Sequence, residues 1–420
     1  MIMCSKVKRI RAILLDRYVT IYHFLISCVF YSRKQPHQNT SVPHIRVSYT
    51  RVGCIQVFLA FGFLACLSAC TTQLPQAPKP PAQLRPAAAL IPPDRIFYMK
   101  DGARIPARVW AAKSVTGGHL QGGHPRALLL MFHGFNDSRD AWETVAPVFA
   151  EHGVTVVAPD QRGFGAAPQR SYWAGSARMV ADAREEALTL MRENPGVPLY
   201  LAGESMGGAI IMVLMAQPDA PPVAGSILLA PAVWQLGFGA TSLLDVIATL
   251  CPYGVVTGRE VHRHVLASDN ISALIRLYYD PLSLRGTRFI ALQGLVHLMD
   301  QAARAAPNLH GRVLCFYGGR DQLIPPWAMA EVWHRFGKNV RRDFFSRGYH
   351  LLLRDRDRSI VEQDILSWMF YPDRFLPSGG DNTASVWFAQ REGETHLGSK
   401  SVLWFLPAQL DALIATNKQG

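Results

Sequence analysis

The chain has 420 residues, of which 49% belong to the hydrophobic set and 18% are charged; this excludes a disordered chain, a coiled coil and a disulfide scaffold, and indicates one large globular domain with extensions, or two domains. Of the net charge of +12, +8 lies in residues 1–70, so the rest of the chain does not favour a nucleic-acid partner. Five of the seven cysteines also lie there, and the remaining two, Cys251 and Cys315, predict neither a disulfide framework nor a metal site.

Residues 51–70 have the layout of an export signal. The uncharged apolar run 53–65 follows Arg51 and leads into a small-residue stretch that ends at Cys70. The Leu-Ser-Ala-Cys ending resembles a bacterial lipobox, which implies that Cys70 is acylated and becomes the first residue of the mature chain. The alternative is an uncleaved membrane anchor formed by residues 52–69.

The segments before and after this predicted signal also have distinctive sequences. Residues 71–93 are rich in Pro, Ala and Gln and predict an extended linker. Because Thr71, not an aspartate, follows the cysteine, the resemblance implies an exported lipoprotein that a lipid anchor tethers to the outer membrane, facing the periplasm. Signals rarely carry a preamble as long as residues 1–50, so we interpret these as an extension from a start codon assigned too far upstream.

Residues 94–372 alternate between short apolar runs and longer amphipathic stretches. Residues 95–110 predict a hairpin. Continuous apolar runs, typical of strands buried on both faces, occur at 126–132, 154–159, 198–203, 226–230 and 312–318. Stretches typical of helices lie between them, at 138–152, 176–193 and 206–216. The alternation predicts an α/β fold with a mainly parallel sheet, helices on both faces and an antiparallel hairpin at its start.

The interval 231–308 is too long for a simple connection between strands. Its apolar residues recur at helical spacing, as at Leu243, Leu244, Ile247 and Leu250. We interpret the interval as a helical cap inserted over the sheet, whose apolar rows either line a channel or pack against the helices of the sheet. Residues 373–420 form a C-terminal tail for which the sequence predicts no role.

Ser205 stands in a sequence typical of a nucleophile. It lies in Gly-Glu-Ser-Met-Gly, directly after the predicted strand 198–203 and before the predicted helix 206–216. A turn this tight leaves no room for side chains two residues before and two residues after the serine, which is why Gly203 and Gly207 stand there. A serine hydroxyl is a weak nucleophile, so it requires a base, and the base requires an orienting acid.

Two later loops supply candidates for that base and acid. Asp321 follows the strand 312–318, and His350 lies between a predicted last strand, 340–346, and a predicted last helix, 351–369. Parallel α/β sheets carry their sites on loops at the carboxyl ends of the strands, and the chain order Ser, Asp, His is the one expected for this turn. We predict that Ser205 is the nucleophile, Asp321 the orienting acid and His350 the base.

An acyl-transfer site also requires hydrogen-bond donors for the oxyanion. The sequence His133-Gly134-Phe135 ends another predicted strand, where glycine allows the backbone to approach a substrate. We expect the backbone N–H groups of Phe135 and Met206 to hold the developing negative charge, and His133 to be structural.

Five motifs, HGFNDS, PDQRGFGAA, GESMGG, GGRDQLIPP and GYHLLL, occur in this order between residues 96 and 369. With them the chain resembles the monoacylglycerol lipase/lysophospholipase branch, of serine aminopeptidase S33 type, of the α/β-hydrolase superfamily. The resemblance implies the α/β-hydrolase fold. It also implies the same assignment of nucleophile, acid, base and oxyanion donors.

The expected activity is that of a serine hydrolase that cleaves carboxylic esters through an acyl-enzyme, without cofactor or metal. Monoacylglycerols, lysophospholipids or similar acyl esters are the expected substrates. Two alternatives stay open. An aminopeptidase-type amide hydrolase would need an acidic cap residue to hold the free amine, which Asp245 or Glu260 could supply. A non-catalytic binding lipoprotein on the same fold would tolerate loss of a triad member, and all three are present.

The lipobox resemblance makes a prediction about the mature protein. We expect the chain extracted from membranes to begin at Cys70 and to carry acyl groups, which the intact mass measures directly. Each buried methylene adds about 0.8 kcal/mol of membrane affinity, so Cys70→Ser should release the protein or leave it unprocessed. A mass that retains residues 52–69 would instead support the uncleaved anchor.

Overall fold

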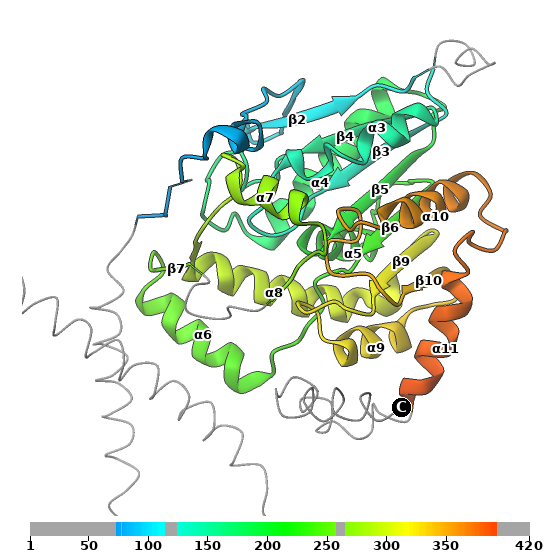
Figure 1. Ribbon diagram of the computed structural model, residues 1–420. Helices are drawn as coiled ribbons and strands as arrows, with labels where there is room; N and C mark the ends of the chain where they lie inside the picture. Colours follow the sequence, from blue (N-terminus) through cyan, green and yellow to red (C-terminus); the bar gives the residue numbers. More distant parts are fainter. Residues whose placement is uncertain (1–72, 77, 114–123, 258–264, 393–420) are drawn as a thin grey trace, which may run out of the picture. The chain divides into compact units, whose positions relative to one another are not determined.

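The computed structural model describes residues 73–76, 78–113, 124–257 and 265–392, all of which belong to the unit Phe61–Gly420. Their main feature is an eight-stranded sheet in the order β1-β2-β4-β3-β5-β6-β9-β10 (Figure 1). Its strands are β1 (Arg95–Tyr98), β2 (Arg104–Trp110), β3 (Ala127–Phe132), β4 (Val154–Pro159), β5 (Leu199–Glu204), β6 (Gly225–Leu229), β9 (Val313–Gly318) and β10 (Val340–Phe345). Only the pairs β1–β2 and β2–β4 are antiparallel. The predicted α/β fold is confirmed, and the predicted strands agree with the observed ones to within one residue.

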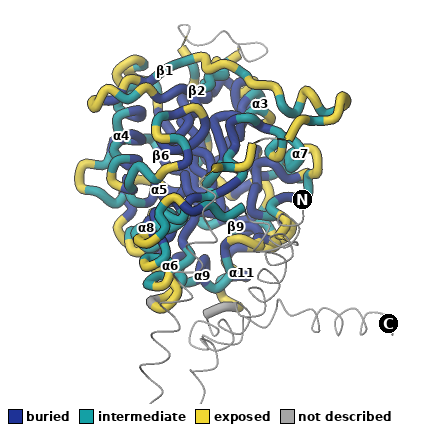
Figure 2. Tube along the Cα trace, turned by 90° about the vertical axis from the view of Figure 1, so that its left-hand side faces the viewer, coloured by how far each residue is buried: buried dark blue, intermediate teal, exposed yellow. Residues whose placement is uncertain are grey.

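The central strands are apolar because both of their faces are covered. All residues of β3, β5, β6 and β9 are buried. Side chains alternate between the two sides: Leu128, Leu130 and Phe132 of β3 join one core, whereas Leu129 and Met131 join the other. Figure 2 shows buried residues, in dark blue, gathered in the interior of the described part. A continuous apolar run is therefore what this position in the sheet requires.

Helices lie on both faces of the sheet, as predicted. One core receives residues of α4 (Ser176–Glu193), α5 (Met206–Met215), α8 (Phe289–Ala305), α9 (Pro326–Arg335) and α11 (Gly380–Glu392). The opposite core receives residues of α3 (Ala146–Glu151) and α10 (Arg358–Phe370). The described residues also contain three 3₁₀ helices: η1 (Ala82–Ala88), η3 (Arg139–Trp142) and η4 (Ala306–Asn308).

Two predicted helices differ from those observed. The stretch 138–152 forms η3 and α3 instead of one helix. Pro147 lies in the first turn of α3, where its missing N–H is harmless, but it would interrupt a helix that continued through it. The last helix begins at Arg358 instead of residue 351, because the intervening residues form turns whose side chains bind other loops.

The interval between β6 and β9 contains α6 (Phe238–Leu250), β7 (Val255–Val256), α7 (Ile271–Tyr279), β8 (Thr287–Arg288) and α8. Its last helix, α8, packs on α5 and belongs to the helical layer of the sheet. The apolar row on α6 divides: Leu243 and Leu250 are about 60% exposed, whereas Leu244 and Ile247 are half-buried. Leu243 and Leu250 therefore neither pack against the sheet helices nor line an enclosed channel.

The sequence did not predict α11, which packs against β10 at the edge of the sheet (Figure 1). Trp387 stacks on Phe344 of β10 with ring centroids 4.9 Å apart, and meets Trp333 of α9 edge-on at 5.0 Å. Arg341 of β10 also forms an ion pair with Asp381. The aromatic contacts make α11 part of the core.

The turn between β5 and α5 depends on two glycines. A Cβ at Gly207 would lie 2.2 Å from the carbonyl oxygen of Phe132, and a Cβ at Gly203 would lie 2.4 Å from the carbonyl carbon of Gly207. Both distances are far below van der Waals contact. The absence of side chains at these positions lets α5 start directly against β3 and β5.

This contact predicts a specific loss of stability. Gly207→Ala should lower the free energy of unfolding by about 1–3 kcal/mol, because backbone atoms must move to admit the methyl group. Gly239 in α6, where an added Cβ would meet nothing within 4 Å, supplies the control, and Gly239→Ala should be neutral or slightly stabilising. Urea titration measures both. Equal effects of the two substitutions would contradict the close-approach argument.

Candidate active site

Ser205 occupies a strained turn between β5 and α5. Its φ of 53° and ψ of −112° lie where residues with a Cβ are rare. The Ser205 N–H donates to the carbonyl of Leu229 at 2.9 Å, and its own carbonyl accepts from the N–H of Ala232 at 2.9 Å. These bonds to β6 and the residues after it hold the serine at the carboxyl edge of the sheet.

Asp321 and His350, which the sequence predicts as acid and base, are in direct contact. They follow β9 and β10, and the parallel pairing of these strands brings their loops together. His350 Nδ1 lies 2.8 Å from Asp321 Oδ2, and both side chains are at most 2% exposed. Since a carboxylate can only accept, Nδ1 carries the proton and Nε2 of the neutral ring keeps its lone pair.

Asp321 is itself held by backbone donors. Its Oδ1 accepts the N–H groups of Leu323 and Ile324 at 2.8 and 2.9 Å, which leaves Oδ2 for the histidine. Burial lowers the pKa of His350. This effect is outweighed by the charge of Asp321, by the hydrogen bond to Asp321 and by the charge of Glu204, so the pKa lies above the ordinary 6.5. The ring is therefore oriented and made more basic by the same carboxylate.

The loop after β3, which carries the predicted donor Phe135, adjoins the Ser205 turn. A Cβ at Gly134 would lie 3.6 Å from Ser205 Cβ. The ring of Phe135 packs edge-on against Phe164, with centroids 5.3 Å apart. Within the described part of the chain, the N–H groups of Phe135 and Met206 donate to no protein acceptor. Both are thus available to an oxygen bound beside Ser205.

His133 is buried in a wholly different setting. Its Nε2 accepts the N–H of Gln161 at 3.0 Å, so Nδ1 carries the proton and donates to the Gly134 carbonyl at 2.8 Å. Burial lowers the pKa of His133, despite the charges of Asp137 and Asp160. With both nitrogens occupied, this neutral ring braces the loop, which agrees with the structural role expected for it.

Sequence reasoning missed three charged residues beside the site. Arg354 forms an ion pair with Asp137, and its Nη2 lies 3.5 Å from Oε1 of Glu204. All three side chains are at most 8% exposed. Each lies within four residues of a predicted site residue, in the motifs HGFNDS, GESMGG and the segment after GYHLLL. The sequence signal that could have identified them is that each charged residue lies in or directly after a motif of the predicted site.

Other predicted residues lie apart from this site or outside the described residues. Asp245, a candidate amine ligand, accepts from Gln293 Nε2 and lies next to His297 Nε2, both at 2.9 Å. Cys70 and Glu260 lie outside the described residues. No group of three or more His, Cys, Asp or Glu in the described ranges is arranged to hold a metal ion. None of the described helices is long and apolar enough to cross a membrane.

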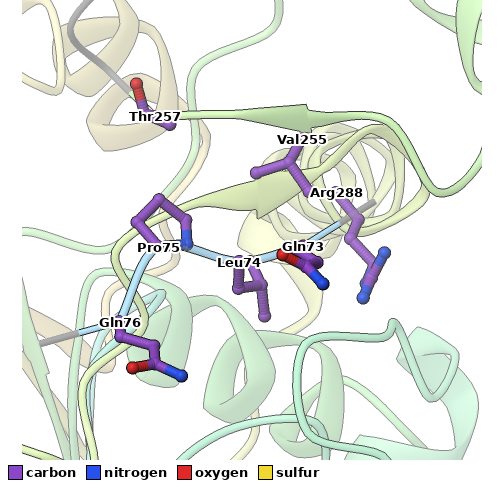
Figure 3. Close-up of a pocket in the computed structure, with 7 residues that line it drawn as sticks. All are labelled: Gln73, Leu74, Pro75, Gln76, Val255, Thr257 and Arg288. Carbon is purple, nitrogen blue, oxygen red and sulfur yellow. The ribbon is translucent and has the colours of Figure 1, made fainter. Parts of the chain in front are cut away.

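An open pocket of about 790 Å³ lies on another part of the unit (Figure 3). The linker residues 73–76 form one side, and the two-stranded sheet β7–β8 with Thr257 forms the other. It shares no lining residue with the Ser205 turn, Asp321 or His350. This pocket is therefore separate from the candidate active site.

Curated relatives align with this chain over most of their own length. Mouse monoglyceride lipase is 26% identical over 257 residues, which cover 59% of this chain and 83% of the relative. Monoacylglycerol lipase of Mycolicibacterium smegmatis is 26% identical over 275 residues, 64% of this chain and 93% of the relative.

Solved structures agree on the fold. A soluble variant of monoglyceride lipase from Saccharomyces cerevisiae has a TM-score of 0.55 at 16% identity, covering 70% of this chain and 98% of that one. Monoacylglycerol lipase from Paleococcus ferrophilus has a TM-score of 0.52 at 19% identity, covering 63% and 98%. The family model described as serine aminopeptidase, S33, matches residues 123–357, more than half of the chain. The chain therefore belongs to the serine aminopeptidase S33 family of α/β-hydrolases.

Proposed function

We propose that the chain is a serine hydrolase that cleaves carboxylic esters, with monoacylglycerols or lysophospholipid-like acyl esters as substrates. The observation that carries the proposal is the buried Asp321–His350 pair, which shares the carboxyl edge of the sheet with a serine in a strained strand-to-helix turn. The named monoglyceride lipases among the relatives support the ester class.

The chemistry follows from the proposed roles. His350 Nε2 takes the proton of the Ser205 hydroxyl as its oxygen attacks the ester carbonyl. The N–H groups of Phe135 and Met206 bind the oxyanion of the tetrahedral intermediate. His350 then gives its proton to the leaving alcohol as the carbon–oxygen bond breaks. A water molecule, deprotonated by the same ring, attacks the acyl-enzyme and releases the acid and the free serine.

An amide-cleaving role is the second candidate, because the matching family takes its name from an aminopeptidase. Such an enzyme must bind the free amine of its substrate. The carboxylate of Asp245 already binds Gln293 and His297 and is 40% exposed, which makes it a weak anchor for an amine. The described residues therefore favour the ester over the aminoacyl amide.

We also propose that the protein acts as an exported lipoprotein at the outer membrane, facing the periplasm. The support is the signal-like segment 51–70 and the Pro/Ala-rich linker that follows it. Tethering through Cys70 would keep the enzyme beside a lipid surface, where acyl esters of low solubility accumulate.

Substitution of the three proposed triad residues tests the chemistry. Ser205→Ala, Asp321→Asn and His350→Ala should each leave a folded protein whose esterase activity is lower by roughly 10³-fold or more, since the three act as one unit. Ser226, a buried serine on the neighbouring strand β6, supplies the control. A fluorophosphonate probe should label the parent and Ser226→Ala but not Ser205→Ala. Labelling that survives in Ser205→Ala would disprove the assignment.

A substrate panel separates the two candidate functions. We expect the parent to hydrolyse monoacylglycerols and p-nitrophenyl esters with kcat/KM well above that for aminoacyl amides, because Asp245, the candidate amine ligand among the described residues, already contacts Gln293 and His297. Asp245→Asn should leave the ester activity unchanged. If aminoacyl amides are the better substrates and Asp245→Asn abolishes their cleavage, the peptidase alternative is correct.

A further inference from the structure

A buried cluster of charged side chains links the three loops that carry the proposed active-site groups. The guanidinium of Arg354 forms an ion pair with the carboxylate of Asp137 and lies 3.5 Å from Glu204 Oε1. Exposure of these side chains is 8% for Arg354, 7% for Asp137 and zero for Glu204. The contacts span more than 140 residues of sequence and are therefore made by the fold, not by local turns.

Each member of the cluster stands next to one functional group. Asp137 lies two residues after Phe135, in the loop that carries a proposed oxyanion donor. Glu204 is the last residue of β5 and directly precedes Ser205. Arg354 follows His350 by four residues, in the turns before α10. One side chain thus contacts both the oxyanion loop and the nucleophile turn while belonging to the loop of the base.

The hydrogen bonds that join the His350 loop to the cap do not hold it against the Ser205 turn or the oxyanion loop. The loop of His350 bonds to the cap through the N–H of Leu351 and the carbonyl of Ala267, and through the Asn270 amide and the carbonyl of Arg354. Neither bond reaches the Ser205 turn or the oxyanion loop. Among the side-chain hydrogen bonds of the described residues, those of Arg354 join the His350 loop to both the oxyanion loop and the Ser205 turn.

A gain in folding stability does not by itself explain why these charged groups are buried. It holds two carboxylates and one guanidinium in the interior, and within the described residues Glu204 Oε2 and Arg354 Nε bond to no partner. Burial, with the charges of Asp137 and Asp355, raises the pKa of Glu204 to about 7, against the opposing charges of Arg354 and His350. Apolar side chains of similar volume usually stabilise such a position at least as well, so a role in the site is the better explanation.

We propose that Arg354 is a positioning residue: through Asp137 and Glu204 it fixes the loops of Phe135, Ser205 and His350 relative to one another, and Glu204, in its ionised form, adds to the negative charge that acts on His350. This inference rests on the proposed function, because it assigns no new chemistry and acts only through the proposed nucleophile and base. A displacement of about 1 Å between reacting groups can cost roughly 100-fold in rate, which is the scale on which the cluster matters.

Three variants separate positioning from stability, all made in the full chain and measured with p-nitrophenyl butyrate. Arg354→Met removes the charge at similar volume and should lower kcat roughly 10- to 100-fold while KM changes little, because binding of the acyl chain does not use Arg354. Arg354→Lys keeps the charge and should recover part of the lost kcat. Arg162→Met removes another buried arginine, paired with Asp182 and Asp101, and should lower thermal stability without this selective loss of kcat.

Glu204→Gln tests the electrostatic part and remains informative if Arg354→Met fails to fold. The charges of Asp321, Glu204 and Arg354 act on the pKa of His350, and Asp321 is in direct contact with the ring. Of these, Glu204 raises the pKa of His350, so the neutral amide should lower that pKa. Activity requires neutral His350, and the acid limb of the kcat/KM profile should therefore move to lower pH. In Arg162→Met the acid limb should stay in place.

The outcomes distinguish this inference from the function on which it rests. If the parent hydrolyses no ester and does not react with a fluorophosphonate, the proposed function fails. If the parent is active, the inference is overturned when Glu204→Gln leaves the acid limb unmoved, or when Arg354→Met loses no more kcat than Arg162→Met. A selective loss of kcat, partial recovery by lysine and an acid limb displaced to lower pH together support it.

Discussion

Burial of the central strands on both faces is the constraint from which the rest of the structure follows. Strands β3, β5, β6 and β9 expose no residue, so none of them can present a polar side chain to solvent along its length. Groups that perform chemistry must then lie where the strands end. Ser205, Asp321 and His350 all occupy such ends, and parallel pairing brings the ends to one edge.

The same burial gives opposite properties to two histidines. His133 and His350 are both at most 2% exposed. Two backbone partners occupy the nitrogens of His133, and burial keeps the pKa of that ring low. A carboxylate at 2.8 Å orients His350 and raises its pKa instead. Both rings have negative charges near them, so the direct hydrogen bond to a carboxylate, not burial, distinguishes His350 from His133.

Prediction from sequence succeeded where a residue's own neighbours in the chain dictate its structure. The apolar runs predicted the strands, and the glycines around Ser205 predicted the tight turn, because both depend on local composition. Prediction failed where partners lie far apart. Arg354 meets Glu204 across 150 residues, and Trp387 of the tail meets Phe344 of β10. The place of Arg354 next to a site motif does not tell which side chains it meets, and the sequence of the tail gives no sign that it packs on β10.

The position of α11 has a consequence for the order in which the chain acquires its structure. β10 is the last strand at its edge of the sheet, and Trp387 covers Phe344 from a helix that is made still later. A chain emerging amino terminus first therefore keeps this aromatic surface open until almost all of the described residues have been synthesised. The aromatic core at this edge of the sheet is therefore completed only when the last described helix has been made.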